Sequence, residues 1–274
     1  MMIPTPAPDD GGADATQAQR TALAWTHTAR FLTTASQLDQ LPAHDLAEVA
    51  FVGRSNAGKS TAINTLAQQR QLAFASKTPG RTQHINLFEV GPKGAPHALW
   101  TDLPGYGYAA VSKSAKLRWQ AVMADYLSKR RNLGGVVQMV DSRHGFTPLD
   151  LQLLNFVMPR VASGEVKLLV LLTKADKLNR KEAAESLRQV QQQLGEMTTE
   201  QADVGVCLFS ALKLQGVGDV AEVLREWCLS AHAISAAARA LGEGVLIDPD
   251  RLHGTSTDQA TDAAASAADS STDA

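Results

Sequence analysis

The sequence predicts an α/β fold: a mostly parallel six-stranded sheet with one antiparallel strand and helices on both faces. Three observations support this prediction. Apolar runs rich in β-branched residues alternate with helical patterns between residues 48 and 240, which is typical of a parallel sheet flanked by helices. Two of these runs are joined by a short segment rich in Gly and Pro, which indicates a hairpin and hence one antiparallel strand. A glycine-rich loop at 53–58 separates the first run from the first helix.

The individual elements follow in chain order. A lead-in segment at about 31–41 precedes the first strand, and loops occupy 70–84 and 103–112. We expect strands at 48–52, 85–90, 98–102, 136–141, 167–173 and 204–210. We expect helices at 60–69, 114–131, 148–161, 180–194 and 217–240. In such a sheet the loops at the carboxyl ends of the strands build the ligand site, so their content decides the function.

The 274 residues, 44% of them hydrophobic, suffice for one substantial domain, which we place at 23–240. Residues 1–22 and 241–274 are predicted to be a disordered N-terminal tail and a low-complexity acidic C-terminal tail, because they offer little apolar surface to bury. Residues 1–19 and 254–274 hold seven Asp and no Lys or Arg, which leaves 26 basic against 21 acidic residues (+5) between them. The domain is therefore modestly basic and compatible with a nucleic-acid partner.

Composition also excludes several classes of protein. Cys207 and Cys228 are the only cysteines, too few for a disulfide scaffold or a cysteine-based zinc site. The N-terminal segment lacks the basic and apolar regions of a secretory signal. The most apolar run, at 166–173, is far shorter than the ~20 residues that a membrane span needs. We therefore expect a cytoplasmic protein that does not bind a membrane.

The first loop, from Gly53 to Ser60, reads GRSNAGKS and matches the phosphate-binding pattern GxxxxGK[ST]. Its glycines allow successive backbone N–H groups to point at phosphate oxygens, and the following helix N-terminus adds positive potential. Lys59 would reach the β- and γ-phosphates, and the Ser60 hydroxyl would coordinate Mg²⁺. The alternative is a glycine-rich turn without a ligand, which the strand-loop-helix context disfavours. The sequence therefore predicts a P-loop NTPase.

A second motif, Asp102-Leu103-Pro104-Gly105, ends the third expected strand. The Asp102 carboxylate could hold Mg²⁺ through water, and the Gly105 N–H could bond the γ-phosphate and release it after hydrolysis. Asp and Gly are common residues in the turns that follow strands, so the motif alone says little. Its position two strands after the P-loop favours the nucleotide site.

The third motif, Thr173-Lys174-Ala175-Asp176, indicates which base is bound. Guanine presents two adjacent N–H donors that one carboxylate can accept together, whereas adenine lacks this pair, so Asp176 would select guanine. The stem of Lys174 can cover one face of the base, and backbone N–H groups at Ser210-Ala211 could meet the guanine oxygen. An ordinary charged turn is the alternative in isolation. Asp176 disfavours the further possibility of an ATP-dependent P-loop enzyme.

A switch threonine that completes the Mg²⁺ site must come from the loop between the first helix and the second strand. Thr78 and Thr82 both lie there. Thr78 precedes Pro79, which restricts it to an extended turn. We favour Thr82, because it lies three residues before the strand.

These motifs, each at a strand end and in this order, predict a Ras-like G domain. The chain resembles the TrmE-Era-EngA-EngB-Septin class of GTPases and, within it, the EngB (YihA/YsxC) group of bacterial ribosome-biogenesis GTPases. The resemblance covers about residues 25–235 and rests on GRSNAGKS, KTPGRTQHINLF, DLPGYGYA, VDSRHGFTPLD, LLTKADKL and FSALKLQG. Thr173 stands where many GTPases have Asn, but threonine is usual in this group. The long acidic C-terminal tail is unusual, and the resemblance implies nothing for it.

The resemblance implies a GTP-binding protein that acts with Mg²⁺ and is needed for large ribosomal subunit assembly and, through it, normal cell division and septation. The metal-binding groups would be Ser60, Thr82 and, through water, Asp102. The expected GTP-binding residues are Gly53, Arg54, Ser55, Asn56, Ala57, Gly58, Lys59, Ser60, Gly80, Arg81, Thr82, Gln83, His84, Asp102, Leu103, Pro104, Gly105, Thr173, Lys174, Ala175, Asp176, Phe209, Ser210 and Ala211.

Two positions bear on catalysis. Tyr106 follows the second motif where many GTPases have a water-orienting Gln, so we expect slow intrinsic turnover and assign no catalytic base. In some relatives an Asn at the position of Asn56 helps to hold K⁺, which supplies the charge of an arginine finger. The alternative is that Asn56 only stabilises the loop through its own backbone.

A basic segment follows the loop at 103–112 and could contact the expected partner, the large ribosomal subunit or its RNA. It consists of Lys113, Lys116, Arg118, Lys129, Arg130 and Arg131, with Trp119 and Tyr126 interleaved. The alternative is a solvated helix face whose aromatic residues pack inward. We expect a monomer that does not bind DNA, and a structural role for Arg143 and His144. The rival function is a GDP/GTP-dependent module that recruits cell-division proteins without needing hydrolysis.

Overall fold

A computed structural model describes residues 16–73, 84–107 and 113–244 of the chain. Within these segments the strands are β1 (Arg30–Ala35), β2 (Ala47–Gly53), β3 (Ile85–Val90), β4 (Ala98–Asp102), β5 (Leu133–Asp141), β6 (Lys167–Thr173) and β7 (Val204–Leu208). The α-helices are α1 (Gln17–Thr26), α2 (Lys59–Leu66), α3 (Lys113–Lys129), α4 (Pro148–Ala162), α5 (Arg180–Gly195) and α6 (Val217–Gly244). Two short 3₁₀ helices lie at Leu38–Gln40 and Ala175–Lys177.

The strands form one sheet in the order β1-β3-β4-β2-β5-β6-β7. β3 runs antiparallel to both of its neighbours, and the other pairs are parallel, so the predicted α/β fold with one antiparallel strand is confirmed. The predicted count of six strands is wrong, because the lead-in segment contains β1. β1 is an edge strand on which Phe31 and Leu32 are both exposed, so it lacks the alternation that identifies a half-buried strand.

The folded part also begins earlier than expected. Residues 17–22, which were predicted to lie in the N-terminal tail, belong to α1. Thr16 and Gln19 form a capping box at its start, in which each side chain accepts a hydrogen bond from the other residue's backbone N–H at 3.1 Å. Ala22 and Trp25 then bury the inner face of the helix. A polar, Ala-rich helix with so few buried residues resembles a tail in composition, which explains the wrong prediction.

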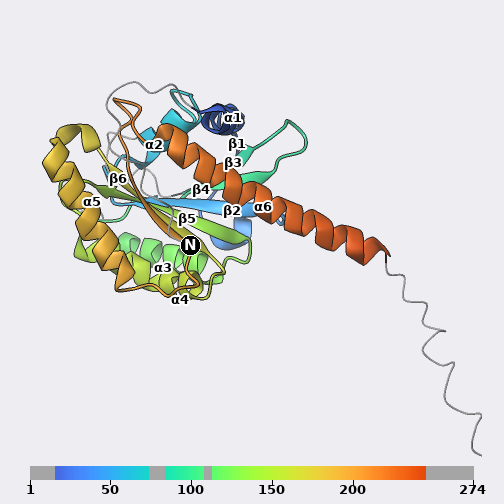
Figure 1. The fold of residues 1–274 in the computed structure, drawn as a ribbon. Helices are drawn as coiled ribbons and strands as arrows, with labels where there is room; N and C mark the ends of the chain where they lie inside the picture. Colours follow the sequence, from blue (N-terminus) through green and yellow to red (C-terminus); the bar gives the residue numbers. More distant parts are fainter. Residues whose placement is uncertain (1–15, 74–83, 108–112, 245–274) are drawn as a thin grey trace, which may run out of the picture. The chain divides into compact units, whose positions relative to one another are not determined.

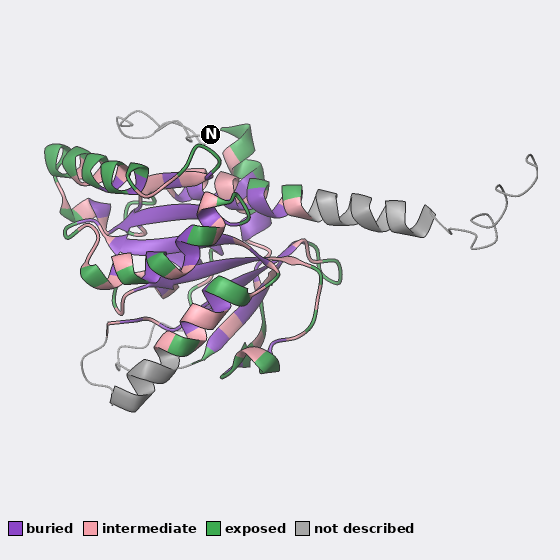
Figure 2. Cartoon of the chain, turned by 90° about the horizontal axis from the view of Figure 1, so that it is seen from below, coloured by how far each residue is buried: buried purple, intermediate pink, exposed green. Residues whose placement is uncertain are grey.

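The helices cover both faces of the sheet (Figure 1). One apolar core lies between the sheet and α1, α2 and α6, and the other lies between the sheet and α3, α4 and α5. The strands between these layers are largely buried, whereas the outer surfaces of the helices are exposed (Figure 2). This sheet belongs to the first of two compact units, Met1–Ser235; the second, Ala236–Ala274, contains the last turns of α6.

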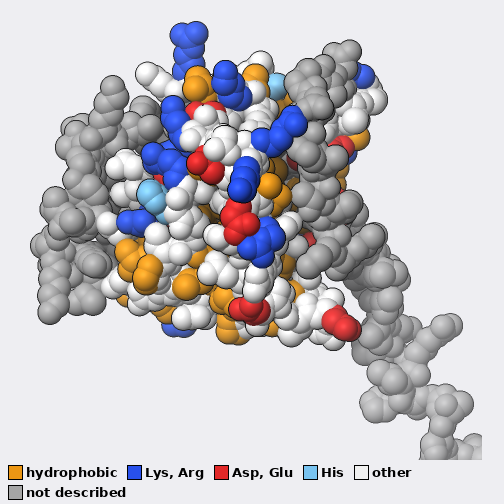
Figure 3. Space-filling model, turned by 60° about the vertical axis from the view of Figure 1, so that its left-hand side comes forward, with side chains coloured by type: hydrophobic (Ala, Val, Ile, Leu, Met, Phe, Trp, Pro, Cys, Tyr) orange, Lys and Arg blue, Asp and Glu red, His pale blue; other side chains and the backbone are white. Residues whose placement is uncertain are grey.

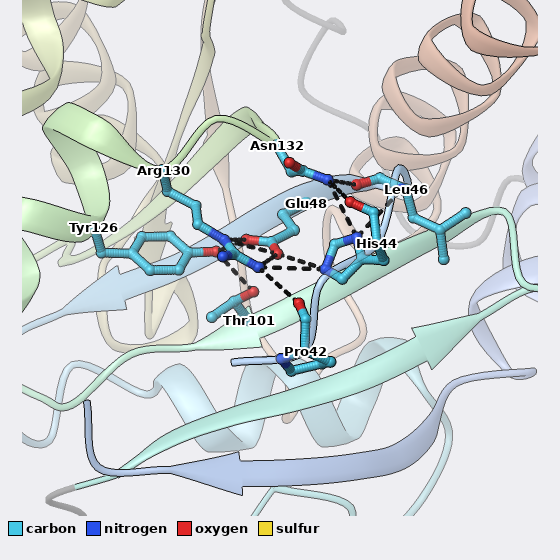
Figure 4. A network of polar contacts seen from close by, with 8 residues as sticks. All are labelled: Pro42, His44, Leu46, Glu48, Thr101, Tyr126, Arg130 and Asn132. Carbon is cyan, nitrogen blue, oxygen red and sulfur yellow. Dashed lines mark hydrogen bonds and ion pairs between the residues drawn. The ribbon is translucent and has the colours of Figure 1, made fainter. Parts of the chain in front are cut away.

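A buried polar cluster, which we call the Glu48 network, ties α3 to the start of β2 (Figure 4). Glu48 is fully buried, and its carboxylate accepts hydrogen bonds from Arg130 at 2.6–3.1 Å and from the Tyr126 hydroxyl. His44 Nε2 lies 2.8 Å from Glu48 Oε1. Burial opposes ionisation, but the hydrogen bonds from His44, Arg130 and Tyr126 outweigh it and lower the pKa of Glu48 to about 2. The other members are Pro42, Leu46, Thr101 and Asn132.

This network changes the interpretation of the basic segment. Arg130 is paired with a buried carboxylate and Tyr126 is fully buried, so neither is presented to a nucleic acid. For Tyr126, the alternative of an aromatic residue that packs inward therefore holds. Lys129 and Arg131 are exposed, with Lys129 2.6 Å from Asp125. The side chains of 113–119 lie outside the described residues.

Candidate nucleotide site

Four of the sequence motifs meet at one edge of the sheet because their strands run parallel. Gly53 ends β2, Asp102 ends β4, Thr173 ends β6, and Phe209 follows β7. β3 runs the opposite way and pairs Asn86 with Asp102, so residues just before it lie at this same edge. Among them, His84 is exposed and its Nδ1 is 2.8 Å from Ser36 Oγ. The predicted site residues Gly80, Arg81, Thr82 and Gln83, and the alternative Thr78, lie outside the described residues.

The P-loop adopts a backbone that its residue types allow. Gly58 at the N-cap of α2 has φ of +94° and Asn56 has φ of +66°. Glycine has no Cβ to oppose this left-handed conformation, and Asn tolerates it better than most residues do. Asn56 therefore has a structural reason to stand at this position that does not involve a cation.

Lys59 and Asp102 meet at the centre of this edge. Lys59 Nζ donates a hydrogen bond to Asp102 Oδ1, and both side chains are buried. The second carboxylate oxygen, Asp102 Oδ2, is buried without a hydrogen-bond partner among the described residues. A buried carboxylate oxygen that still needs a partner is suited to a hydrated cation.

The second motif runs alongside the P-loop. Ser55 N donates to Tyr106 O at 2.8 Å, and Tyr106 N donates to Gly53 O at 3.3 Å. A Cβ on Gly105 would lie 3.3 Å from the N and Cα atoms of Ser55, so glycine permits this close approach. The backbone of Gly105 is thereby held against the loop that is predicted to bind phosphate.

The Tyr106 side chain is held in place by hydrogen bonds. Its hydroxyl donates to Asp150 Oδ1 at 2.7 Å and accepts from Gln138 Nε2 at 3.3 Å. Burial first, and then the neighbouring Asp150 carboxylate, raise the pKa of Tyr106 far above its ordinary value. The phenol is therefore neutral and engaged with α4 and β5, so it does not supply the side-chain amide that orients water in many GTPases.

The end of β6 joins the P-loop to the predicted base-recognition residues. Thr173 Oγ1 lies 2.6 Å from Ala57 O and 3.1 Å from Val140 O. Lys174 has φ of +58°, and its Nζ donates to Asn56 O at 2.8 Å. A threonine hydroxyl is thus sufficient to link this strand end to the P-loop.

Asp176 is oriented by the loop after β7. Ser210 Oγ donates to Asp176 Oδ1 at 2.7 Å, and Ala175 N donates to Phe209 O at 3.1 Å. The hydrogen bond from Ser210 is the main cause of the lowered pKa of Asp176, so the carboxylate stays ionised and acts as an acceptor. The Ser210 N–H already donates to Gln215 O at 3.1 Å, which leaves Ala211 as the better candidate to meet a base oxygen.

Comparisons with known proteins agree with this arrangement. A family model described as "50S ribosome-binding GTPase" matches residues 48–174. The "Probable GTP-binding protein EngB" of Acidovorax ebreus (strain TPSY) is 59% identical over 220 residues, which cover 80% of this chain and 97% of that protein. The chain belongs to the EngB family of GTP-binding proteins.

A second relative supports the same family, and a solved structure supports the same fold. The protein of the same name from Albidiferax ferrireducens (strain ATCC BAA-621 / DSM 15236 / T118) is 58% identical over 217 residues, covering 79% of this chain and all of that protein. The crystal structure of Era in complex with MgGDPNP and a 16S ribosomal RNA fragment shares the fold, with a TM-score of 0.51 and 20% identity over 68% of this chain and 57% of that one. GTP binding and, in general, GTP hydrolysis follow from membership of this GTPase family.

In the part of the chain that the structure describes, no three or more His, Cys, Asp or Glu side chains lie together so as to hold a metal ion. None of the helices in this part of the chain is both long and apolar enough to span a membrane.

Sequence reasoning missed one group of residues at this site. Asp141 at the end of β5 contacts both Arg143 and Lys174. The motif DSRHG was recognised in the sequence, but the separation of Asp141 and Lys174 along the chain does not indicate that their side chains are in contact.

Proposed function

We propose that this chain is a slow cytoplasmic GTPase switch needed for large ribosomal subunit assembly and, through it, for normal cell division and septation. The observation that carries the guanine part is the Asp176 carboxylate, oriented by Ser210 at the same edge as the P-loop. The description of the matching family as 50S ribosome-binding supports the ribosomal part. Lys and Arg side chains gather over the upper part of the face in Figure 3, which also suits an RNA partner.

In this proposal each motif has one role. The P-loop amides and Lys59 hold the phosphates, Asp176 accepts the two N–H donors of guanine, and the stem of Lys174 covers the base. Gly105 offers its N–H to the γ-phosphate. Thr82 and the neighbouring residues 80–84 would complete the site from the segment that precedes β3.

Mg²⁺ would be held by Ser60, by Thr82 and, through water, by Asp102, whose Oδ2 has no hydrogen-bond partner within the described part of the chain. When bound, it neutralises charge on the transferring phosphoryl group. The residues of this chain would hold the γ-phosphate in line with the attacking water and exclude bulk water. No side chain is assigned as the base, because Tyr106 is engaged by Asp150.

Base selection is tested by Asp176→Asn. Xanthine carries an oxygen where guanine carries its amino group, so an asparagine amide can donate to xanthine but cannot accept both guanine protons. We expect this variant to lose GTP binding by about 100-fold, because the amide keeps one acceptor but loses the charge and turns its NH2 group toward the guanine amino group, and to gain XTP binding. Titration of the variant and the wild type with GTP, XTP and ATP measures these affinities. Unchanged preference for GTP over XTP would refute the role of Asp176.

The ribosomal role is tested by depleting the protein and comparing subunit profiles. We expect large subunits to fall relative to small ones and immature particles to accumulate. Normal large subunits with defective septation would instead favour a GDP/GTP-dependent recruitment module of the division machinery. The engagement of Tyr106 is the observation that favours this second candidate, because such a module does not need fast hydrolysis.

Turnover and its cation dependence need a separate measurement. Tyr106 in place of a water-orienting Gln supports slow intrinsic hydrolysis. A K⁺ ion near Asn56 would supply positive charge at the phosphates, so GTP turnover should then be faster in KCl than in NaCl. Equal rates would leave Asn56 with only its backbone role.

A further inference from the structure

The DSRHG motif at 141–145 has no role in the proposed function, yet its first residue lies beside the base-recognition loop. Asp141 is the last residue of β5, and β5 and β6 run parallel with Asp141 paired in register to Thr173. Lys174 is the next residue after Thr173, and its Nζ lies 2.9 Å from Asp141 Oδ2. The sheet itself therefore brings the two motifs together.

The Lys174 ammonium group is fixed at two points. It donates to Asn56 O at 2.8 Å and to Asp141 Oδ2 at 2.9 Å. Arg143 in turn orients the carboxylate, because its Nε donates to Oδ1 at 2.9 Å and its Nη2 donates to Oδ2 at 2.7 Å. The backbone N of Arg143 also donates to Oδ1 at 3.2 Å.

Asp141 keeps its charge under all ordinary conditions. Its side chain is only 15% exposed, and this partial burial disfavours the ionised form. The hydrogen bonds from Arg143 and Lys174 outweigh that effect and hold the pKa of Asp141 well below its usual range. Arg143, at 43% exposed, balances the negative charge on the solvent side.

We propose that Asp141, oriented by Arg143, is a positioning residue that fixes Lys174 for guanine-nucleotide binding. The inference rests on the proposed role of Lys174 in covering the base. A lysine side chain has four rotatable bonds, and ordering them costs rotamer entropy. When Asp141 and Asn56 order them in advance, that cost does not weaken nucleotide binding.

The test is Asp141→Asn, which keeps the shape of the side chain and removes its charge. We expect about tenfold weaker binding of both GDP and GTP, the scale of one lost charge-assisted hydrogen bond. The factor should be equal for the two nucleotides, because Lys174 covers the base and not the phosphates. If Asp141 acted only by repelling phosphates, the variant would instead bind GTP more tightly. Glu165→Gln is the matched control, since it breaks an ion pair between the exposed Glu165 and Arg160 before β6, at the opposite end of that strand.

A double-mutant cycle with Lys174→Gln separates positioning from a general structural effect. We expect Asp141→Asn to cost nothing further once Lys174 is gone. Equal losses in both backgrounds would overturn the inference and leave the proposed function intact. A wild-type chain that fails to bind GDP, or a Lys174→Gln variant that binds as wild type, would overturn the proposed site and the inference with it. If Asp141→Asn does not fold, Asp141→Glu serves in the same cycle, because it keeps the charge but displaces it from Lys174.

Discussion

At the scale of single residues, Glu48 shows how a carboxylate far from the site can govern stability. It has no exposed surface and is held by Arg130, Tyr126 and His44. Removing one partner of a buried pair leaves the other charge uncompensated. We expect Glu48→Gln to lower the free energy of unfolding at pH 7 by about 3 kcal/mol, measured by urea denaturation.

The pH dependence of this effect has a definite sign. The folded-state pKa of Glu48, about 2, lies below its ordinary value of 4.5, so its ionisation stabilises the fold above pH 4.5. That contribution is lost as the pH falls from about 4.5 through about 2. The wild type and Glu48→Gln should therefore converge in stability at low pH. A difference that stays constant from pH 7 to pH 3 would show that packing, and not charge, is responsible.

At the scale of elements, strong local patterns were enough to predict most of the fold. β6 is an unbroken apolar run and α2 follows a glycine loop, so the types of both elements agree with the prediction. β6 also has the predicted bounds, whereas the helix expected at 60–69 spans Lys59–Leu66. α1 and β1 were missed because their residues are polar or exposed, and only contacts with distant segments make them regular. Trp25 of α1, for example, packs edge-on against Trp100 of β4 with ring centroids 6.3 Å apart.

This contact makes α1 part of the folded domain, which can be measured. Trp25 is 7% exposed, and its Nε1 donates to His97 Nδ1 at 3.2 Å. We expect Trp25→Ala to cost about 3–5 kcal/mol of unfolding free energy, the range for truncating a buried aromatic side chain. Phe31→Ala is the control, because Phe31 is 54% exposed and its loss should cost far less. Similar unfolding midpoints for Trp25→Ala and the wild type would show that α1 contributes nothing to the core.

At the scale of the whole molecule, the predicted site residues that the structure describes lie at one edge of the sheet. Motifs that are far apart in the sequence come close together there, because each follows the carboxyl end of a parallel strand. Asp102, Thr173 and Asp176 could be placed there from sequence for that reason. The contacts between individual side chains could not be predicted in this way. The pairing of Arg130 with Glu48 and of Lys174 with Asp141 joins residues 82 and 33 positions apart. Nothing in local spacing distinguishes these basic side chains from ones that face solvent.

Charge distribution over the whole chain leads to a last prediction. Residues 254–274 carry Asp258, Asp262, Asp269 and Asp273 and no basic residue, so removing them changes the formal net charge from −2 to +2. If the partner is ribosomal RNA, the acidic segment repels it, and the truncated chain should bind large subunits about two- to fivefold more tightly at low salt. The gain should vanish as added KCl screens the charges. Replacing the four aspartates with asparagine keeps the length of the segment and should reproduce the gain, whereas a gain from truncation alone would assign the effect to bulk rather than to charge.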